Sequence, residues 1–189
     1  TYSQAGTLNA SVNSSLLQDG SYNISFNVSD SLGNYNQTLR KITVDNTRPV
    51  FDFLGINDGD IRASGDLNVD AGWSDAASGV ETASFTLENQ TESYARSLNG
   101  TVYEADLSNS VYNLTYSIED YAGNNYSETV EVLYDTKAPS LKVFKPENNS
   151  LASVNFSVAA GFSDGVSGIK NATYSVVNDS TVLSGQLND

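Results

Sequence analysis

Apolar and polar residues alternate along most of the chain. The clearest runs cover residues 22–28, 112–118 and 154–158, in which every second residue is apolar. A period of two places the apolar side chains on one face of a β-strand, which is typical of a half-buried strand. Further strands are expected at residues 50–54, 67–73, 80–87, 102–107 and 130–134. No segment indicates a helix.

Turn-forming residues separate the expected strands, at residues 57–59, 77–79, 99–100 and 122–124. About seven short strands in 90 residues, each with one apolar and one polar face, indicate two antiparallel sheets packed face to face. The predicted fold class is therefore all-β, with β-sandwich domains.

The sequence repeats itself. Residues 22–49, YNISFNVSDSLGNYNQTLRKITVDNTRP, return at an offset of 90 as residues 112–139, YNLTYSIEDYAGNNYSETVEVLYDTKAP. Residues 73–80, WSDAASGV, return at an offset of 89 as FSDGVSGI. Self-similarity at this period indicates tandem domains. We expect the second half of a domain in residues 1–48, a complete domain in residues 49–139 and the first half of another in residues 140–189.

Composition excludes several classes of function. The net charge is −14, from 23 acidic and 9 basic residues, whereas nucleic-acid binding depends on basic patches. Cys and His are absent, which rules out disulfides, thiolate or imidazole metal sites, and Ser-His or Cys-His catalysis. No apolar run reaches the roughly 18 residues of a membrane span. We expect a protein that is not an enzyme, with no nucleic-acid partner and no membrane span in this segment.

Three short motifs carry a resemblance to a known family. They are Asp-x-x-Gly-Asn at residues 30–34 and 120–124, the Asp-to-Pro linkers at residues 45–49 and 135–139, and Ser-Asp-x-x-Ser-Gly at residues 74–79 and 163–168. Together they resemble the bacterial and archaeal Ig-like repeat domains of cell-surface proteins, over the whole chain. The resemblance implies tandem Ig-like β-sandwich domains with a repeat of about 90 residues and an extracellular, cell-surface location. Such repeats serve adhesins, stalks, surface layers and the non-catalytic parts of secreted enzymes.

Asn-x-Ser/Thr sequons are strongly enriched. Thirteen are present, where the composition alone would give about five. Asn23, Asn27, Asn113 and Asn155 fall on the polar side of alternating strands, where a glycan would project into water. We therefore predict N-glycosylation at a meaningful fraction of the sequons: Asn9, Asn13, Asn23, Asn27, Asn36, Asn89, Asn99, Asn113, Asn125, Asn148, Asn155, Asn171 and Asn178. The alternative is that Asn, Ser and Thr are simply common in turns and on exposed strand faces.

The combination of many sequons with no Cys gives an indication of the type of host organism. A eukaryotic secreted domain of this kind would commonly carry disulfides. Together with the family resemblance, their absence favours an archaeal surface protein.

Aspartates recur at equivalent positions and allow two interpretations. The pairs are Asp30 with Asp120, Asp45 with Asp135, and Asp75 with Asp164. One interpretation is a Ca²⁺ site at a domain junction, since hard cations prefer carboxylate and carbonyl oxygens. The other is that each Asp bonds its own backbone and forms a turn. No cofactor is predicted, and calcium stays an open possibility.

Aromatic side chains are expected in the core and not on a carbohydrate-binding surface. Trp73 corresponds to Phe162, and Phe26, Tyr112 and Tyr116 share the apolar register of their strands.

The leading hypothesis for function is a structural, glycosylated cell-surface protein: a tandem Ig-like segment of an extracellular filament, surface layer or stalk. The alternatives are an adhesin or ligand-binding module and a non-catalytic spacer of a secreted enzyme. The expected partners are like subunits or neighbouring Ig-like repeats, together with N-linked glycans. The two half-domains either complete each other between chains by strand addition or belong to a longer array.

Overall fold

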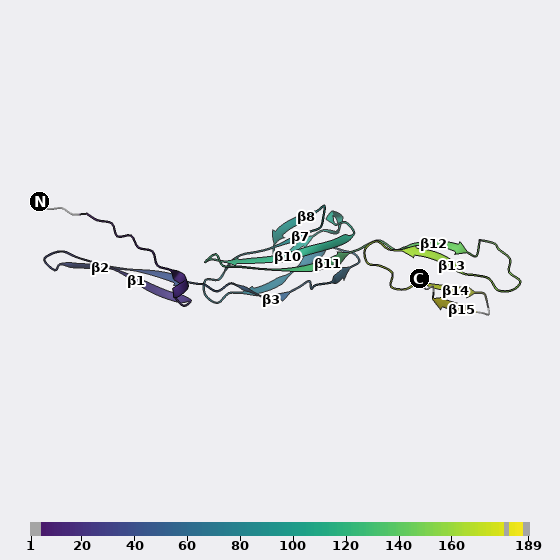
Figure 1. The fold of residues 1–189 in the computed structure, drawn as a ribbon, viewed down its shortest axis with the longest axis horizontal. Helices are drawn as coiled ribbons and strands as arrows, with labels where there is room; N and C mark the ends of the chain where they lie inside the picture. Colours follow the sequence, from purple (N-terminus) through teal and green to yellow (C-terminus); the bar gives the residue numbers. More distant parts are fainter. Residues whose placement is uncertain (1–4, 180–181, 187–189) are drawn as a thin grey trace.

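The computed structural model describes residues 5–179 and 182–186 (Figure 1). Three parts follow one another along the longest axis of the molecule. We call residues 5–48 the N-terminal segment, residues 49–139 the central sandwich, and the described residues from 140 onward the C-terminal segment. The outer ends of the predicted domains 1–48 and 140–189 lie outside the described residues.

The central sandwich contains a five-stranded sheet in the order β4-β11-β10-β7-β8. Its strands are β4 (Asp60–Arg62), β7 (Val80–Glu88), β8 (Ser93–Ser97), β10 (Ser110–Asp120) and β11 (Asn125–Tyr134). Two further pairs face it, β3 (Val50–Leu54) with β6 (Ala71–Ser74), and β5 (Leu67–Val69) with β9 (Gly100–Val102). The predicted all-β, Ig-like sandwich class is confirmed.

The apolar core of the described residues lies between these sheets. Strand β10 shows why the sequence pattern works, since Tyr112, Leu114 and Tyr116 are at most 1% exposed while Asn113 between them is exposed. The Tyr116 hydroxyl reaches the backbone of Ile56, with its oxygen 3.3 Å from the nitrogen and 3.4 Å from the carbonyl oxygen. A buried hydroxyl needs such partners. The expected core positions of both tyrosines are confirmed, and the partly buried Trp73 packs against the same core.

The flanking segments consist of two-stranded pairs. The N-terminal segment holds β1 (Gly20–Ser29) against β2 (Tyr35–Val44), and the C-terminal segment holds β12 (Ser140–Lys145) against β13 (Ala159–Ser163) and β14 (Thr173–Val177) against β15 (Val182–Gln186). The only helical turns in the described chain are two 3₁₀ turns, Ser14–Leu16 and Glu104–Asp106.

Phe26 does not lie in a core, contrary to the prediction. It has the register of Tyr116, but its side chain is 44% exposed. Its neighbours on the same strand, Ile24 and Val28, are 37% and 67% exposed. The physical reason is that no second sheet faces the β1–β2 hairpin among the described residues.

One expected strand does not form, and two others differ from the prediction in extent. Residues 154–158 are not a strand, because β13 begins at Ala159. Residues 67–73 are two strands that pair with different partners, separated at Asp70. The strand expected at residues 102–107 ends at Val102 and continues as a 3₁₀ turn. In each case the pairing partner sets the length of the strand, and the local alternation does not reveal it.

One strand pair departs from the expected antiparallel arrangement. The short strand β4 pairs in parallel with β11, through residues 60–62 and 132–134. Neither β4 nor the edge strand β8 was predicted from the sequence. The other pairs in the central sandwich are antiparallel.

The difference in burial between Leu114 and its equivalent Ile24 should appear as a difference in their contribution to stability. We predict that Leu114→Ala lowers the free energy of unfolding of the central sandwich by about 2–4 kcal/mol, because it opens a cavity in a closed core. Ile24→Ala is the matched control and changes it by less than about 1 kcal/mol. Urea unfolding followed by the fluorescence of Trp73, the single tryptophan, reports the central sandwich. Equal losses in the two variants would contradict the burial described here.

Candidate functional site at the domain junctions

The Asp-x-x-Gly-Asn motif is a tight turn closed by its own aspartate. Asp120 ends β10, and its Oδ1 accepts the N–H groups of Ala122 at 2.8 Å and Asn124 at 2.9 Å. Gly123 has a φ of +87°, which glycine adopts without strain. The hairpin tip at Asp30 repeats the geometry, with the N–H groups of Leu32 and Asn34 at 2.9 and 2.8 Å.

The Ser-Asp-x-x-Ser-Gly motif forms a second aspartate-centred turn. Asp75 follows β6, and its Oδ1 accepts the N–H groups of Ala77, Ser78 and Gly79 at 3.1, 3.0 and 2.7 Å. A carboxylate oxygen that accepts three backbone donors fixes the shape of the loop.

Asp45 connects these two turns to the N-terminal segment. Its Oδ1 accepts the N–H of Thr47 at 3.0 Å, and its Oδ2 accepts the N–H of Ser78 at 2.9 Å. Its backbone carbonyl accepts the side-chain amide of Asn124 at 3.1 Å, and the same amide lies 3.4 Å from the carbonyl oxygen of Thr47. The three motifs of the sequence therefore meet at one place, which we call the first junction.

The linker at the first junction is also held by packing. Pro49 is buried, and the guanidinium carbon of Arg48 lies 4.2 Å from the ring centroid of Tyr126. A cation over an aromatic face is attractive. The chain between Asp45 and Pro49 is thus fixed at both ends and along its length.

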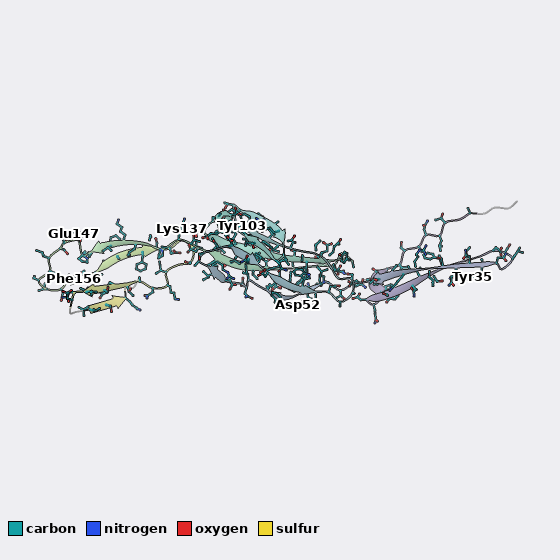
Figure 2. All side chains as sticks on the ribbon, turned by 180° about the vertical axis from the view of Figure 1, so that it is seen from behind. Tyr35, Asp52, Tyr103, Lys137, Glu147 and Phe156 are labelled. Atoms are coloured by element: carbon teal, nitrogen blue, oxygen red, sulfur yellow. The ribbon has the colours of Figure 1, made fainter. Side chains whose placement is uncertain are left out.

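A second junction repeats part of this arrangement between the central sandwich and the C-terminal segment. Asp135 is 7% exposed, and its two oxygens accept the N–H groups of Lys137 at 3.0 Å and Ser167 at 3.1 Å. Asp164 closes the turn that presents Ser167 and accepts the N–H of Gly168 at 3.0 Å. Figure 2 shows Lys137 at this junction, far from Tyr35 in the N-terminal segment.

Hydrogen bonds across the junctions favour the ionised form of both linker aspartates. The neighbouring Ser78 side chain, together with the N–H groups of Thr47 and Ser78, lowers the pKa of Asp45 against the opposing effect of burial. The Ser167 side chain and the N–H of Lys137 likewise lower the pKa of Asp135. Both linker carboxylates are therefore negatively charged at neutral pH.

The first junction brings three carboxylates together. Asp45, Asp75 and Asp120 each offer one oxygen, and these oxygens lie within 4.8 Å of one another. Hydrogen bonds to their own loops show that all three are turn-forming residues, as one interpretation of the sequence expects. Their convergence gives the donor set of a hard cation as well, since such ions take carboxylate oxygens from loops.

The structure places twelve of the thirteen sequon asparagines in exposed positions. Asn113 projects from the outer side of β10, and Asn23 and Asn27 are exposed on β1. Asn155 is exposed too, but it lies outside a strand, contrary to the prediction. Exposure is what a glycan acceptor requires.

Asn89 is the exception among the sequons. It is partly buried, its Oδ1 accepts the N–H groups of Thr91 and Glu92 at 2.8 Å, and its side-chain nitrogen lies 3.3 Å from the Glu92 carboxylate. That nitrogen is the atom to which a glycan would be attached. Glu92 also accepts a hydrogen bond from the Tyr112 hydroxyl, which lowers the pKa of the Glu92 carboxyl.

Sequence reasoning missed two residues that build the junctions. Ser78 presents its N–H to Asp45, and Asn124 bonds to the linker carbonyls. Both recur in the repeat, as Ser167 and Asn34, and this recurrence was the available signal. It does not reveal that these residues contact the linker at residues 45–49.

The sequence was compared with models of known protein families. The family model of a bacterial Ig-like domain matches residues 4–46. The expected resemblance to prokaryotic Ig-like domains is thereby confirmed. Ig-like domains of this kind are typically non-catalytic modules and are often extracellular. No curated protein matches the chain. Among the described residues, no helix is long and apolar enough to span a membrane.

The contacts of Asn124 predict a stiff first junction. We expect Asn124→Ala to broaden the distance distribution between spin labels at Thr38→Cys and Ser84→Cys, because it removes the hydrogen bonds to the linker. Pulsed electron paramagnetic resonance measures this distribution, and the absence of native Cys keeps the labelling specific.

Asn34→Ala is the matched control for this experiment. It disrupts the equivalent turn at the tip of the β1–β2 hairpin, where the Asn34 side-chain amide donates to Asp30 Oδ2 at 2.6 Å within the same turn. It should leave the distribution unchanged. A distribution that is already broad in the unmodified chain would contradict a fixed junction.

Proposed function

We propose that this chain is a structural segment of a prokaryotic, archaeal cell-surface protein, in which tandem Ig-like sandwiches form a row that acts as a filament, surface layer or stalk. The observation that carries the proposal is the first junction, where the five-residue linker at residues 45–49 is hydrogen-bonded to two turns of the central sandwich. A row with fixed junctions holds its ends apart, which is what a stalk or filament requires. In this proposal the protein is not an enzyme.

Two other functions share the same fold. An adhesin or ligand-binding module would use loops at one end of a sandwich. A spacer within a secreted enzyme would use the row alone. The bonded junction favours a structural role over binding, because its contacts lie between the domains and not at a free loop tip.

The exposed sequons support a glycosylated surface. Twelve of thirteen acceptor asparagines are exposed, and the acidic surface and lack of Cys fit an extracellular protein of an archaeon. Glycans on the outer faces would also shield strand edges, which otherwise promote aggregation.

Mass spectrometry of peptides from the natively expressed protein tests glycosylation. We expect glycans on several exposed sequons, including Asn113, and the lowest occupancy at Asn89, where the amide is bonded to Glu92. Asn124 and Asn57 are not in sequons and serve as internal controls. Unmodified peptides at all thirteen positions would contradict the proposal that this is a glycoprotein.

The strands of the flanking segments support the proposal that the binding partners are like subunits or neighbouring Ig-like repeats. In the central sandwich β10 pairs with β7, with Leu114 opposite Leu87 and Tyr116 opposite Phe85. By the offsets of 90 and 89, the corresponding residues are Ile24 with Val176 and Phe26 with Tyr174. The apolar faces of β1 and β14 are thus matched in sequence, and a like subunit or neighbouring Ig-like repeat would pair them by strand addition.

Molar mass in solution tests like subunits as partners. We expect the mass of the 189-residue chain, measured by size-exclusion chromatography with light scattering, to rise with concentration. Phe26→Asp should prevent this rise, because it places a charge in the proposed interface. Val12→Asp is the control, since Val12 is 74% exposed and outside the strands. A monomer at millimolar concentration would contradict like subunits as the partner.

A further inference from the structure

The chain contains two hairpin tips and two linkers of the same kind. The Asp-x-x-Gly-Asn tips are residues 30–34 and 120–124, and the Asp-to-Pro linkers are residues 45–49 and 135–139. The tip at residues 120–124 holds the linker at residues 45–49 through the amide of Asn124. In the described part of the chain, one tip and one linker are left over. We call residues 30–34 the N-terminal tip and residues 135–139 the second linker.

The N-terminal tip already has the shape that binds a linker. Asp30 Oδ1 accepts two backbone N–H groups of the tip at 2.9 and 2.8 Å, as Asp120 does in its own tip at 2.8 and 2.9 Å. The Asn34 amide donates to Asp30 Oδ2 at 2.6 Å, and the Asn124 amide makes the same bond to Asp120 at 2.9 Å. An amide nitrogen carries two N–H donors. Asn124 uses its second donor on the first linker, whereas the described residues offer no such acceptor to Asn34.

The second linker likewise has the conformation of a bound linker. Asp135 accepts the N–H groups of Lys137 and Ser167 at 3.0 and 3.1 Å, which repeats the two bonds of Asp45 at 3.0 and 2.9 Å. The carbonyl oxygens of Asp135 and Lys137 correspond to the two that a side-chain amide approaches at the first junction. At the second junction no side-chain amide of the described residues takes that place. The acceptors are therefore in position and the donor is missing.

The strand pairing proposed above would bring the N-terminal tip to the second linker. In the central sandwich β10 pairs with β7, and beside this pair the N–H of Tyr121 donates to the carbonyl of Gly79 at 3.1 Å. By the offsets of 90 and 89, the corresponding residues are Ser31 in the N-terminal tip and Gly168 in the turn that contacts the second linker. Pairing of β1 with β14 in the same register thus places the tip against the linker.

The tip and the linker of one chain do not lie close enough to meet. Figure 2 shows Tyr35, which follows the N-terminal tip, and Lys137, in the second linker, on opposite sides of the central sandwich. A second copy of the chain is free of this restriction. We propose that the N-terminal tip of a second copy completes the second junction, with its Asn34 amide donating to the carbonyl oxygens of Asp135 and Lys137.

This inference rests on the like-subunit partner proposed above and adds the residue that the partner contributes. The completed junction lacks one contact of the first junction, because the positions of Arg48 and Tyr126 are taken by Ala138 and Asn36. It therefore depends more strongly on the hydrogen bonds of Asn34. Since the tip and the linker lie at opposite ends of the chain, the contact is head-to-tail and continues along a row.

Two variants of the 189-residue chain test the direction of the contact. Phe26→Asp places a charge on the pairing face of β1, and Val176→Asp places one on that of β14. The two side chains are 44% and 38% exposed, so neither change should unfold the chain. We expect each variant alone to be monomeric in sedimentation equilibrium. An equimolar mixture should form a 1:1 dimer that grows no further, because the Val176→Asp chain supplies the hairpin and the Phe26→Asp chain receives it.

Asn34→Ala, added to one chain of this mixture at a time, tests the junction itself. The turn stays closed, because Asp30 Oδ1 still accepts the two backbone N–H groups. In the Val176→Asp chain, which supplies the tip, we expect the change to raise the dissociation constant of the mixed dimer at least tenfold, since two linker carbonyls lose their donor. In the Phe26→Asp chain the same change is the matched control and should leave the constant unaltered.

The possible results separate this inference from the proposed function. An unchanged dissociation constant with Asn34→Ala in the Val176→Asp chain would refute the inference and leave strand addition intact. Equal weakening from either chain would refute it too, because only one of the two tips lies in the interface. If the unmodified chain associates but the mixture forms no dimer, the head-to-tail contact is wrong. If the unmodified chain also stays monomeric, the like-subunit partner fails with it.

Discussion

The Asp45 carboxylate determines how the first two parts of the molecule are connected. One oxygen closes a turn by accepting the N–H of Thr47, and the other accepts the N–H of Ser78 on the next sandwich. A hydrogen bond to an ionised group contributes about 1.5–3 kcal/mol. The linker at residues 45–49 has little conformational freedom once this bond, the Asn124 contacts and the packing of Arg48 on Tyr126 are in place. These contacts thus fix the orientation of the N-terminal segment relative to the central sandwich.

The same aspartates close their own turns and also connect neighbouring parts of the molecule, because a carboxylate has two oxygens. Asp45 and Asp135 use one oxygen for their own turn and the other for the next part of the molecule. Asp75 uses only one, which accepts three N–H groups, and leaves the other buried. Motifs that resemble simple turns therefore also place carboxylates between the parts of the molecule, and three of them meet at the first junction.

Burial in this chain depends on the opposing sheet more than on the residue. Leu114 and Ile24 occupy equivalent positions on alternating strands, yet their exposures are 0% and 37%. The hydrophobic effect favours removal of apolar surface from water. A second sheet covers Leu114 in the central sandwich, whereas none faces the β1–β2 hairpin among the described residues. The polar faces of the same two strands carry the sequons at Asn23, Asn27 and Asn113, which are exposed in either setting.

The sequence by itself determined the all-β class, the core register of β10 and the turns at Asp30 and Asp120, because a period of two and an Asp-x-x-Gly-Asn motif act within a few residues of chain. It also singled out the aspartates that recur, although it left open what they do. Tertiary structure alone decided that β4 pairs in parallel, that the run at residues 67–73 is divided between two pairs of strands, and that Phe26 is exposed. It alone brought Asp45, Asp75 and Asp120 within 4.8 Å of one another. The physical reason is that strand pairing, burial and electrostatic repulsion depend on groups that are distant in the sequence, and no local pattern specifies which of them meet.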